Sequence, residues 1–277
     1  MFRYTKATFL REVLVWIAAL IGLMPFYFLL ATALKPDEEL LTTTSSALPS
    51  RPTVANFTDV LTTSGDNNIL FSLVNSVMIT VGSILGLVAF GSLAAYVLAR
   101  STRRWSSIAF YLFLIAIILP AQLGIIPLYI GARTMGLVGT PWGMIVLYAG
   151  TLMPLAVFLY AGFFRALPRD YEEAAAIDGA GPGRVFLRIV LPLMAPATGT
   201  VAILTGLIVW NDFFTALIFL GGSDYQTLTV SMYYYVGSLV SAWNKIFAIV
   251  IISMIPILGF YLFAQKKFIQ GFAGGVK

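Results

Sequence analysis

Cysteine and histidine are both absent from the 277 residues of this sequence. Without them the chain has no structural disulfide, no thiolate ligand for a metal ion and no imidazole for acid–base catalysis. We therefore predict no metal site, no catalytic residue and no redox chemistry. Charge is scarce as well, because Asp, Glu, Lys and Arg make up 10% of the residues, against about 25% in an ordinary soluble domain.

Long apolar runs are what the sequence does contain, and 59% of its residues are hydrophobic. A helix needs about 20 consecutive apolar residues to cross a bilayer, because its backbone polar groups must be bonded within the protein there. The number of such runs excludes a soluble helical core, and the alternating polarity of a membrane β-barrel is missing. We predict one all-α domain over 1–277, a polytopic bundle of six transmembrane helices at about 13–34, 69–99, 106–130, 141–164, 193–220 and 244–264.

The N-terminal run invites comparison with a signal peptide. Basic residues at 3, 6 and 11 precede it, and Ala31-Thr32-Ala33 resembles a cleavage site. The apolar stretch exceeds the usual length of a signal sequence. An uncleaved first helix is the better interpretation.

Lys and Arg are distributed very unevenly between the loops on the two sides of the predicted bundle. Because basic residues are retained on the cytoplasmic side, this asymmetry predicts that both termini are cytoplasmic. The side chains next to the membrane ends would meet anionic lipid head groups, so the net charge of +5 requires no nucleic-acid partner. Of the 17 basic residues, four lie on the external side, Lys35, Arg51, Arg133 and Lys245, and thirteen on the cytoplasmic side, Arg3, Lys6, Arg11, Arg100, Arg103, Arg104, Arg165, Arg169, Arg184, Arg188, Lys266, Lys267 and Lys277.

Two predicted loops are longer than a packed bundle needs. The external segment 35–68 contains Pro36, Pro49 and Pro52, and is predicted to be irregular. A solvated connector and a binding role are both open for it. The cytoplasmic segment 165–192 has a more specific pattern.

In that cytoplasmic loop, Asp170, Glu172 and Glu173 stand in the first turn of a predicted short helix, where negative charge complements the helix dipole. Gly179 is expected to end this helix in the left-handed conformation. Pro182 suits the first position of a second short helix through Val190, and Pro192 and Pro196 are expected to close the unit before the fifth span.

Small residues at 174–176 and 179–181 would let a partner's backbone approach closely, while the acids, Arg184 and Arg188 offer polar contacts. Docking to a partner and a merely structured loop remain open at this point. Glu172 and Glu173 point to different helix faces, so they do not form an acid–base pair.

The loop resembles the cytoplasmic EAA motif of ABC importer permeases, in Glu173-Ala174-Ala175, Gly179, Ile189 and Leu191-Pro192 at matching spacing. The longer stretch from Tyr171 to Ala180 is similar to the version in sugar importers of the maltose-transporter type. The resemblance to the smaller permease subunit of such systems extends to Asn75-Ser76, to Trp210-Asn211-Asp212-Phe213 and to the ending from Gln270 to Lys277, and it is weakest over 35–68.

The resemblance implies a multi-pass subunit of a bacterial or archaeal plasma (inner) membrane. Its implied partners are a second homologous permease, two ATPase subunits and an extracytoplasmic solute-binding protein, and its implied solute is a di- or oligosaccharide. An importer for another solute is the near alternative. The implied ATPase-coupling residues are Glu172, Glu173, Ala174, Ala175, Asp178, Gly179 and Arg184.

ATP chemistry is not expected in this chain, because the sequence has no Gly-x-x-x-x-Gly-Lys-Ser/Thr phosphate loop. We predict that the chain is not an enzyme and that ATP with Mg²⁺ binds to the partner ATPase. An ion-coupled secondary transporter is a less favoured alternative, since it would need several intramembrane carboxylates and only Asp212 lies well within a predicted span.

Candidate solute contacts are Trp210, Asn211 and Asp212, which combine a stacking face with hydrogen-bonding groups, and Asn75. Membrane anchoring and helix–helix bonding are competing interpretations. The tyrosines at 233–235 flank the last external loop, either as membrane anchors or as contacts with the binding protein: Tyr233, Tyr234 and Tyr235. The tail from Lys266 to Lys277 is expected to reach toward the ATPase subunits and to be ordered only in the assembled complex, because its glycines disfavour autonomous structure.

Overall fold

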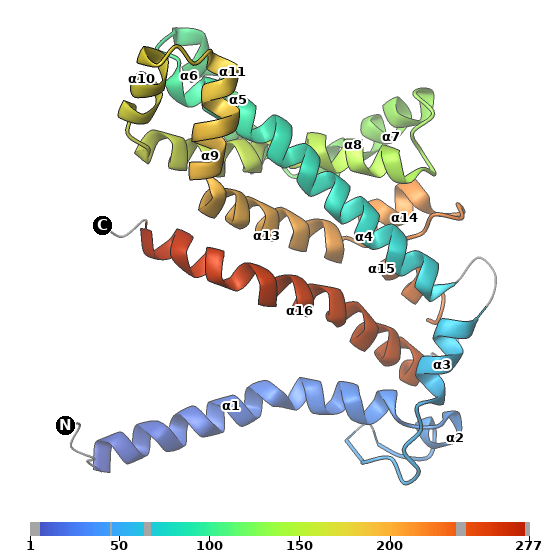
Figure 1. Cartoon of the computed structure of the whole chain (residues 1–277). Coiled ribbons are helices and arrows are strands. Elements are labelled where there is room, and N and C mark those ends of the chain that lie inside the picture. The colour runs from blue at the N-terminus through green and yellow to red at the C-terminus, as the bar shows by residue number, and fades with distance from the viewer. Residues whose placement is uncertain (1–5, 45, 64–67, 237–241, 275–277) are drawn as a thin grey trace. The chain divides into compact units, whose positions relative to one another are not determined.

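The computed structural model describes residues 6–44, 46–63, 68–236 and 242–274, and every regular element within these ranges is a helix (Figure 1). This confirms the predicted all-α class. The chain divides into two compact units, Met1–Leu70 with Ser231–Pro256, and Phe71–Val230 with Ile257–Lys277. The single domain over 1–277 stays a prediction.

Three continuous helices of the described chain are long and apolar enough to cross a membrane. The first is α1 (Lys6–Ala33) and the last is α16 (Trp243–Gly274). Between them, α4 (Ile69–Gly86) continues through a π-helical turn, η1 (Leu87–Gly91), into α5 (Ser92–Arg100).

Three further candidate spans are bent pairs of helices, so the described chain holds up to six spans if each pair counts as one. The pairs bend by 92° after Ile118, by 50° at Leu152 and by 73° at Met194. The pairs comprise α6 (Arg104–Ile118) with η2 (Ala121–Gly124) and α7 (Ile125–Thr134); α8 (Pro141–Thr151) with α9 (Met153–Ala166); and α11 (Pro182–Val185), η3 (Phe186–Val190) and α12 (Leu191–Leu193) with α13 (Ala195–Asn211).

Each of the helices predicted over 106–130, 141–164 and 193–220 is interrupted in the structure, the third between Asn211 and Phe214. Proline explains part of the difference, because it lacks a backbone N–H and disfavours helical geometry in the residue before it. Pro120 follows the end of α6, and Pro154 stands in the first turn of α9. The fifth predicted span ends at Asn211, and α14 (Phe214–Leu220) is a separate helix.

The remaining short helices are α2 (Asp37–Leu40), α3 (Ala55–Thr62), α10 (Asp170–Ile177) and α15 (Leu228–Tyr233). The helix predicted to begin after Pro168 is thus present as α10. Pro192 does not close the second short helix, because α12 runs through it to Leu193. The π-helical turn η3 ends at Val190, two residues before this proline, which cannot donate the usual backbone hydrogen bond.

Within the first unit, the segment after α1 is folded back and fastened rather than extended into solvent. Lys35 is 1% exposed, and the Asn56 amide donates to the carbonyls of Ala33 and Lys35 at 2.8 Å each. The Asn244 amide, from the start of α16, also donates to the Lys35 carbonyl at 3.1 Å. The described part of 35–68 is therefore an ordered element of this unit.

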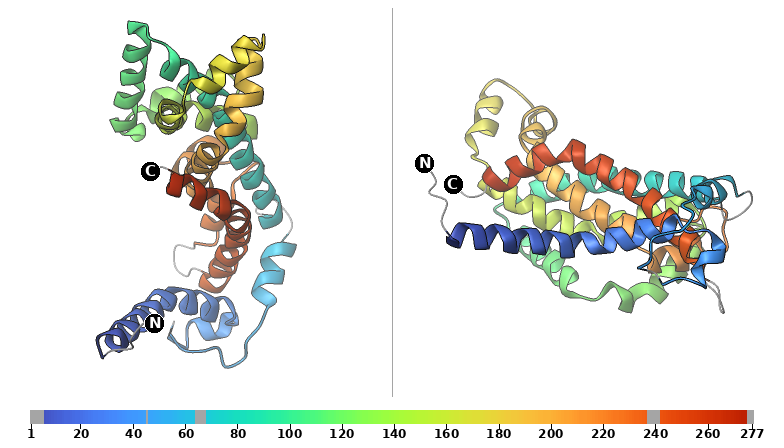
Figure 2. Two further views of the ribbon diagram at one scale, coloured as in Figure 1. Left: turned by 60° about the vertical axis from the view of Figure 1, so that its left-hand side comes forward. Right: turned by 90° about the horizontal axis from the view of Figure 1, so that it is seen from below.

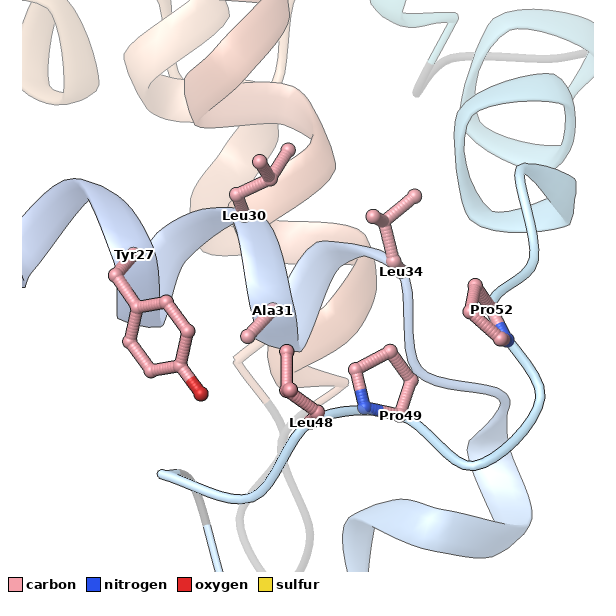
Figure 3. A pocket seen from close by; sticks show the side chains of 7 residues that line it. All are labelled: Tyr27, Leu30, Ala31, Leu34, Leu48, Pro49 and Pro52. Carbon is pink, nitrogen blue, oxygen red and sulfur yellow. The ribbon is translucent and has the colours of Figure 1, made fainter.

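An apolar pocket of about 300 Å³ lies between the C-terminal part of α1 and this segment (Figure 3). The Tyr27 hydroxyl, at the edge of the pocket, donates to the Ser46 carbonyl at 2.9 Å. The lining residues are Tyr27, Leu30, Ala31, Leu34, Leu48, Pro49 and Pro52.

One hydrophobic core of the second unit is formed where α5, α9 and α13 pack together. Tyr160 and Phe164 of α9 are fully buried there, and the Tyr160 hydroxyl donates to the Thr198 hydroxyl of α13 at 3.0 Å. The same core continues into the predicted cytoplasmic loop, where Ala175 and Phe186 are buried. The loop is thus packed onto the helices instead of hanging from them.

The tail differs from the expectation based on its glycines. Helix α16 continues through Gly271 to Gly274, so this chain by itself carries helical structure there. Residues 275–277 lie outside the described residues. A role of the tail toward the ATPase stays a prediction.

Candidate functional site

Helix α10 and the turn after it form the centre of the candidate site, at one end of α5 (Figures 1 and 2). The Gly179 N–H donates to the Ala176 carbonyl at 3.0 Å, and the Ala180 N–H donates to the Ala175 carbonyl at 2.9 Å. These two bonds define a Schellman motif. Gly179 has φ of +79°, which confirms the predicted left-handed helix end.

Glu172 faces inward and fastens α10 to the end of α5. Arg100 Nε donates to Glu172 Oε1 at 2.7 Å, and the Tyr96 hydroxyl donates to Glu172 Oε2 at 2.8 Å. Arg100 also donates to the Leu167 carbonyl at 3.0 Å. These bonds between residues far apart in sequence fix the position of the loop on the helices.

Ala175 is 7% exposed and completes the inner face of α10, together with the partly buried Ala180. Its methyl group lies in the same core as Phe186. Glu172 and Ala175 are spaced by three residues, which places them on one helix face. Two of the seven predicted coupling residues therefore hold the loop in place.

The other face of α10 is open. Glu173, Ala174 and Asp178 are exposed, and Gly179 lies beside them, where an added β-carbon would meet no neighbouring atom of the chain within 4 Å. Glu172 and Glu173 do point to different faces, as predicted. Arg184, on α11, is exposed as well.

Ile177 is a further residue of this open face, and sequence analysis missed it. It is 86% exposed, and Leu187 on the second short element is 62% exposed. Exposed apolar side chains among charged neighbours are typical of a protein interaction surface. The available signal was an isoleucine between Ala176 and Asp178, directly before the helix end.

The predicted solute-contact residues do not form one cluster. Asn75 is 2% exposed, and its amide donates to the Gln226 carbonyl at 3.3 Å. This bond ties the start of α4 to the segment before α15. Such a contact stabilises the helix packing.

Asn211 and Asp212 line a different pocket, of about 350 Å³, together with Tyr148, whereas Trp210 is not among the lining residues. The Tyr148 hydroxyl donates to Asp212 Oδ2 at 2.9 Å. Trp210 precedes Asn211 by one helix position and so points about 100° away. The aromatic side chain that lines this pocket and bonds to Asp212 is therefore Tyr148, which no sequence pattern indicated, and not Trp210.

Tyr233 and Tyr234 are 52% and 47% exposed at the end of α15. Tyr235 follows them, and its N–H donates to the Met232 carbonyl at 3.1 Å. The next residues, 237–241, lie outside the described residues. Contact of these tyrosines with a binding protein stays a prediction.

In the described ranges, no three acidic side chains gather to hold a metal ion.

Comparison with known proteins gives a consistent result. Residues 78–272 match the family described as binding-protein-dependent transport system inner membrane component. The chain is 35% identical over 98% of its length, and 97% of the relative's, to the melibiose/raffinose/stachyose import permease protein MelC of Bacillus subtilis (strain 168). It is 34% identical, over 98% and 96% of the two chains, to AmyC of Thermoanaerobacterium thermosulfurigenes, a probable starch degradation products transport system permease protein.

A solved structure shares the fold, with a TM-score of 0.82 over 97% of this chain and 100% of the other. It belongs to a bacterial ABC transporter involved in the import of the acidic polysaccharide alginate. The two sequences are 22% identical, so this likeness concerns the fold alone.

Proposed function

Because this chain belongs to the family of binding-protein-dependent transport system inner membrane components, we propose that it is the permease subunit of an ATP-driven ABC importer for a neutral di- or oligosaccharide. The names of the relatives MelC and AmyC, which refer to oligosaccharides and to starch degradation products, support the solute class. The chain forms half of the translocation pathway. It spans the bacterial or archaeal plasma membrane with both termini in the cytoplasm.

The observation that carries the proposal is that one face of α10 is bonded to α5 while the opposite face is exposed. Its inner face is fixed to α5 through Glu172, and its outer face presents Glu173, Ile177 and the Gly179 turn. A partner that grips the outer face would therefore move α5 through the inner face. Glu173 and Gly179 transmit force in this mechanism and do not catalyse.

The proposed complex contains a second homologous permease, two ATPase subunits and an extracytoplasmic solute-binding protein. ATP with Mg²⁺ is bound and hydrolysed on the ATPase subunits. Closure of the ATPase pair draws together the docking loops of the two permeases, segment 165–192 in this chain, and rotates the helices packed on them. Energy thus enters this chain through a protein contact.

The test is to purify the chain with its partner subunits, reconstitute the complex in liposomes and measure ATPase activity. We expect stimulation by the binding protein loaded with a subset of a panel of neutral mono-, di- and oligosaccharides. Ion-driven uptake by this chain alone, or the absence of any co-purifying ATPase, would contradict the proposal.

A pair of matched variants tests whether the exposed face of α10 binds the ATPase. Ile177→Ser removes an apolar side chain that is 86% exposed, so it should weaken ATPase pull-down severalfold and leave the fold intact. Met135→Ser, 74% exposed at the end of α7, is the control and should leave pull-down unchanged. Equal pull-down by both variants would remove Ile177 from the interface.

A further inference from the structure

Two helix bends of the second unit and the interruption between α13 and α14 meet at one pocket. Gln122 comes from the break between α6 and α7, Thr151 and Leu152 from the bend between α8 and α9, and Asn211 and Asp212 from the end of α13. The pocket has a volume of about 350 Å³. Small-molecule sites usually begin at about 300 Å³.

The convergence has a physical meaning in a membrane protein. Interrupted helices at membrane depth leave backbone groups that must be satisfied by protein or must line a water-filled cavity. In transporters, such discontinuous helices commonly form the solute site. The meeting of three breaks at one pocket therefore points to an aqueous chamber.

Asp212 stabilises the walls of this pocket through three hydrogen bonds. Its Oδ1 accepts the Thr215 N–H at 3.1 Å, which caps the start of α14, and its Oδ2 accepts the Tyr148 hydroxyl. Its backbone carbonyl accepts the Thr229 hydroxyl at 3.0 Å. The carboxylate thus positions two helices and still has acceptor capacity toward the pocket, since each carboxylate oxygen carries two lone pairs.

The lining has the mixed character that carbohydrate binding requires. Gln122, Thr151 and Asn211 are exposed polar residues, while Leu128 and Phe214 contribute apolar walls. Sugars present hydroxyl groups at their edges and C–H groups on their faces. Hydrogen-bonding groups beside an aromatic or aliphatic wall match both.

Among the described residues that line the pocket, Asp212 alone carries a charge. A carboxylate beside a solute path repels acidic saccharides and accepts neutral ones. We propose that this pocket is a contact site for neutral carbohydrate during transport, shaped by Asp212 and selective through its charge. The proposal rests on the proposed importer function and assigns this subunit its own solute contacts.

Because the chain contains no cysteine, a single probe thiol can be placed in the pocket. In Thr151→Cys, within the complete reconstituted importer, we would measure the rates of reaction with a cationic and with an anionic water-soluble thiosulfonate. Thr151 follows Tyr148 by one helical turn, so the Asp212 charge should favour the cationic reagent by about tenfold over free thiol. Asp212→Asn, which keeps the capping oxygen, should reduce this preference to near unity.

The control is Ile115→Cys, at an exposed position of α6 outside the pocket, which should not react with either reagent. Raffinose delivered by the loaded binding protein should slow the reaction at position 151, and trigalacturonate should not. No reaction at 151 would mean that lipid or the partner permease covers the pocket, and it would overturn the inference, as would a reaction that no saccharide slows. Normal sugar uptake in the same preparation would show that the importer function stands even so.

Discussion

Arg100 at the end of α5 and Glu172 in α10 form a mostly buried ion pair across 72 residues of sequence. Arg100 Nη2 lies 2.6 Å from Glu172 Oε1, and the two side chains are 14% and 16% exposed. The Tyr96 hydroxyl donates a hydrogen bond to the other carboxylate oxygen, Glu172 Oε2. This pair joins α10, in the proposed docking loop, to the end of α5.

Removing one partner of this pair should be costly, because the other charge is left with little solvent. We expect Glu172→Gln to destabilise the loop by about 3 kcal/mol. Limited proteolysis within 165–192 and the thermal midpoint of the purified complex would measure the loss. Glu173→Gln, on the exposed face, is the matched control and should leave both quantities unchanged while weakening ATPase association. Identical behaviour of the two variants would show that the ion pair has no positioning role.

Gly179 should tolerate substitution in a way that separates backbone strain from contact with a partner. At φ of +79° an alanine costs about 1–2 kcal/mol, although no neighbouring atom of the chain lies within 4 Å of its β-carbon. Asparagine adopts this conformation more easily but is larger, and aspartate adds a charge to the same shape.

If close approach by the ATPase matters, Gly179→Asn and Gly179→Asp should both lose ATPase pull-down and sugar uptake while the membrane level stays normal. Gly179→Ala should then be the mildest of the three variants. If alanine alone were damaging, the requirement would be for helix termination only, and the partner contact would have to be sought elsewhere on α10.

Topology is testable with single cysteines, again because the chain has none of its own. We expect positions 103, 188 and 267 to be cytoplasmic and positions 52 and 225 to be external, as the distribution of basic residues predicts. An impermeant thiol reagent applied to intact cells should label only the external pair. Labelling of position 103 would overturn the predicted orientation.

Glu39 should give the external segment a dependence on acid pH. The Ser50 hydroxyl, followed by the backbone N–H groups of Ser50 and Arg51, donates to this carboxylate and lowers the pKa of Glu39. A carboxylate whose folded pKa is depressed stabilises the fold above its unfolded pKa, and this stabilisation is lost as the pH falls through the folded value. Protease sensitivity of segment 34–63 should therefore rise on acidification below the ordinary glutamate pKa.

The isosteric variant Glu39→Gln provides the comparison for that titration. It should be more sensitive to protease than the wild type at neutral pH and should show a flatter dependence on acid pH. Superimposable pH profiles of the two proteins would show that Glu39 does not hold the segment.

The sequence was informative wherever the chemistry is local. Apolar runs of sufficient length predicted a helical membrane protein, and the position of α10 followed from acids in its first turn, three alanines and a glycine. The Gly179 helix end depends on bonds between residues at most five positions apart. Such features are set by backbone preference and nearest-neighbour hydrogen bonds, which the sequence displays directly.

The tertiary structure decided everything that depends on residues far apart. No local pattern indicates that Arg100 pairs with Glu172, or that Tyr148 meets Asp212 across 64 positions. The interruption at Asp212 was not predicted for the same reason. An apolar run predicts a continuous helix, whereas this interruption is stabilised by two hydrogen bonds to the Asp212 carboxylate, from the Thr215 N–H and from the hydroxyl of the distant Tyr148. The sequence by itself determined that helices form and which loop carries a distinctive motif, while packing determined where the helices bend, which acid is buried and which acid stays exposed.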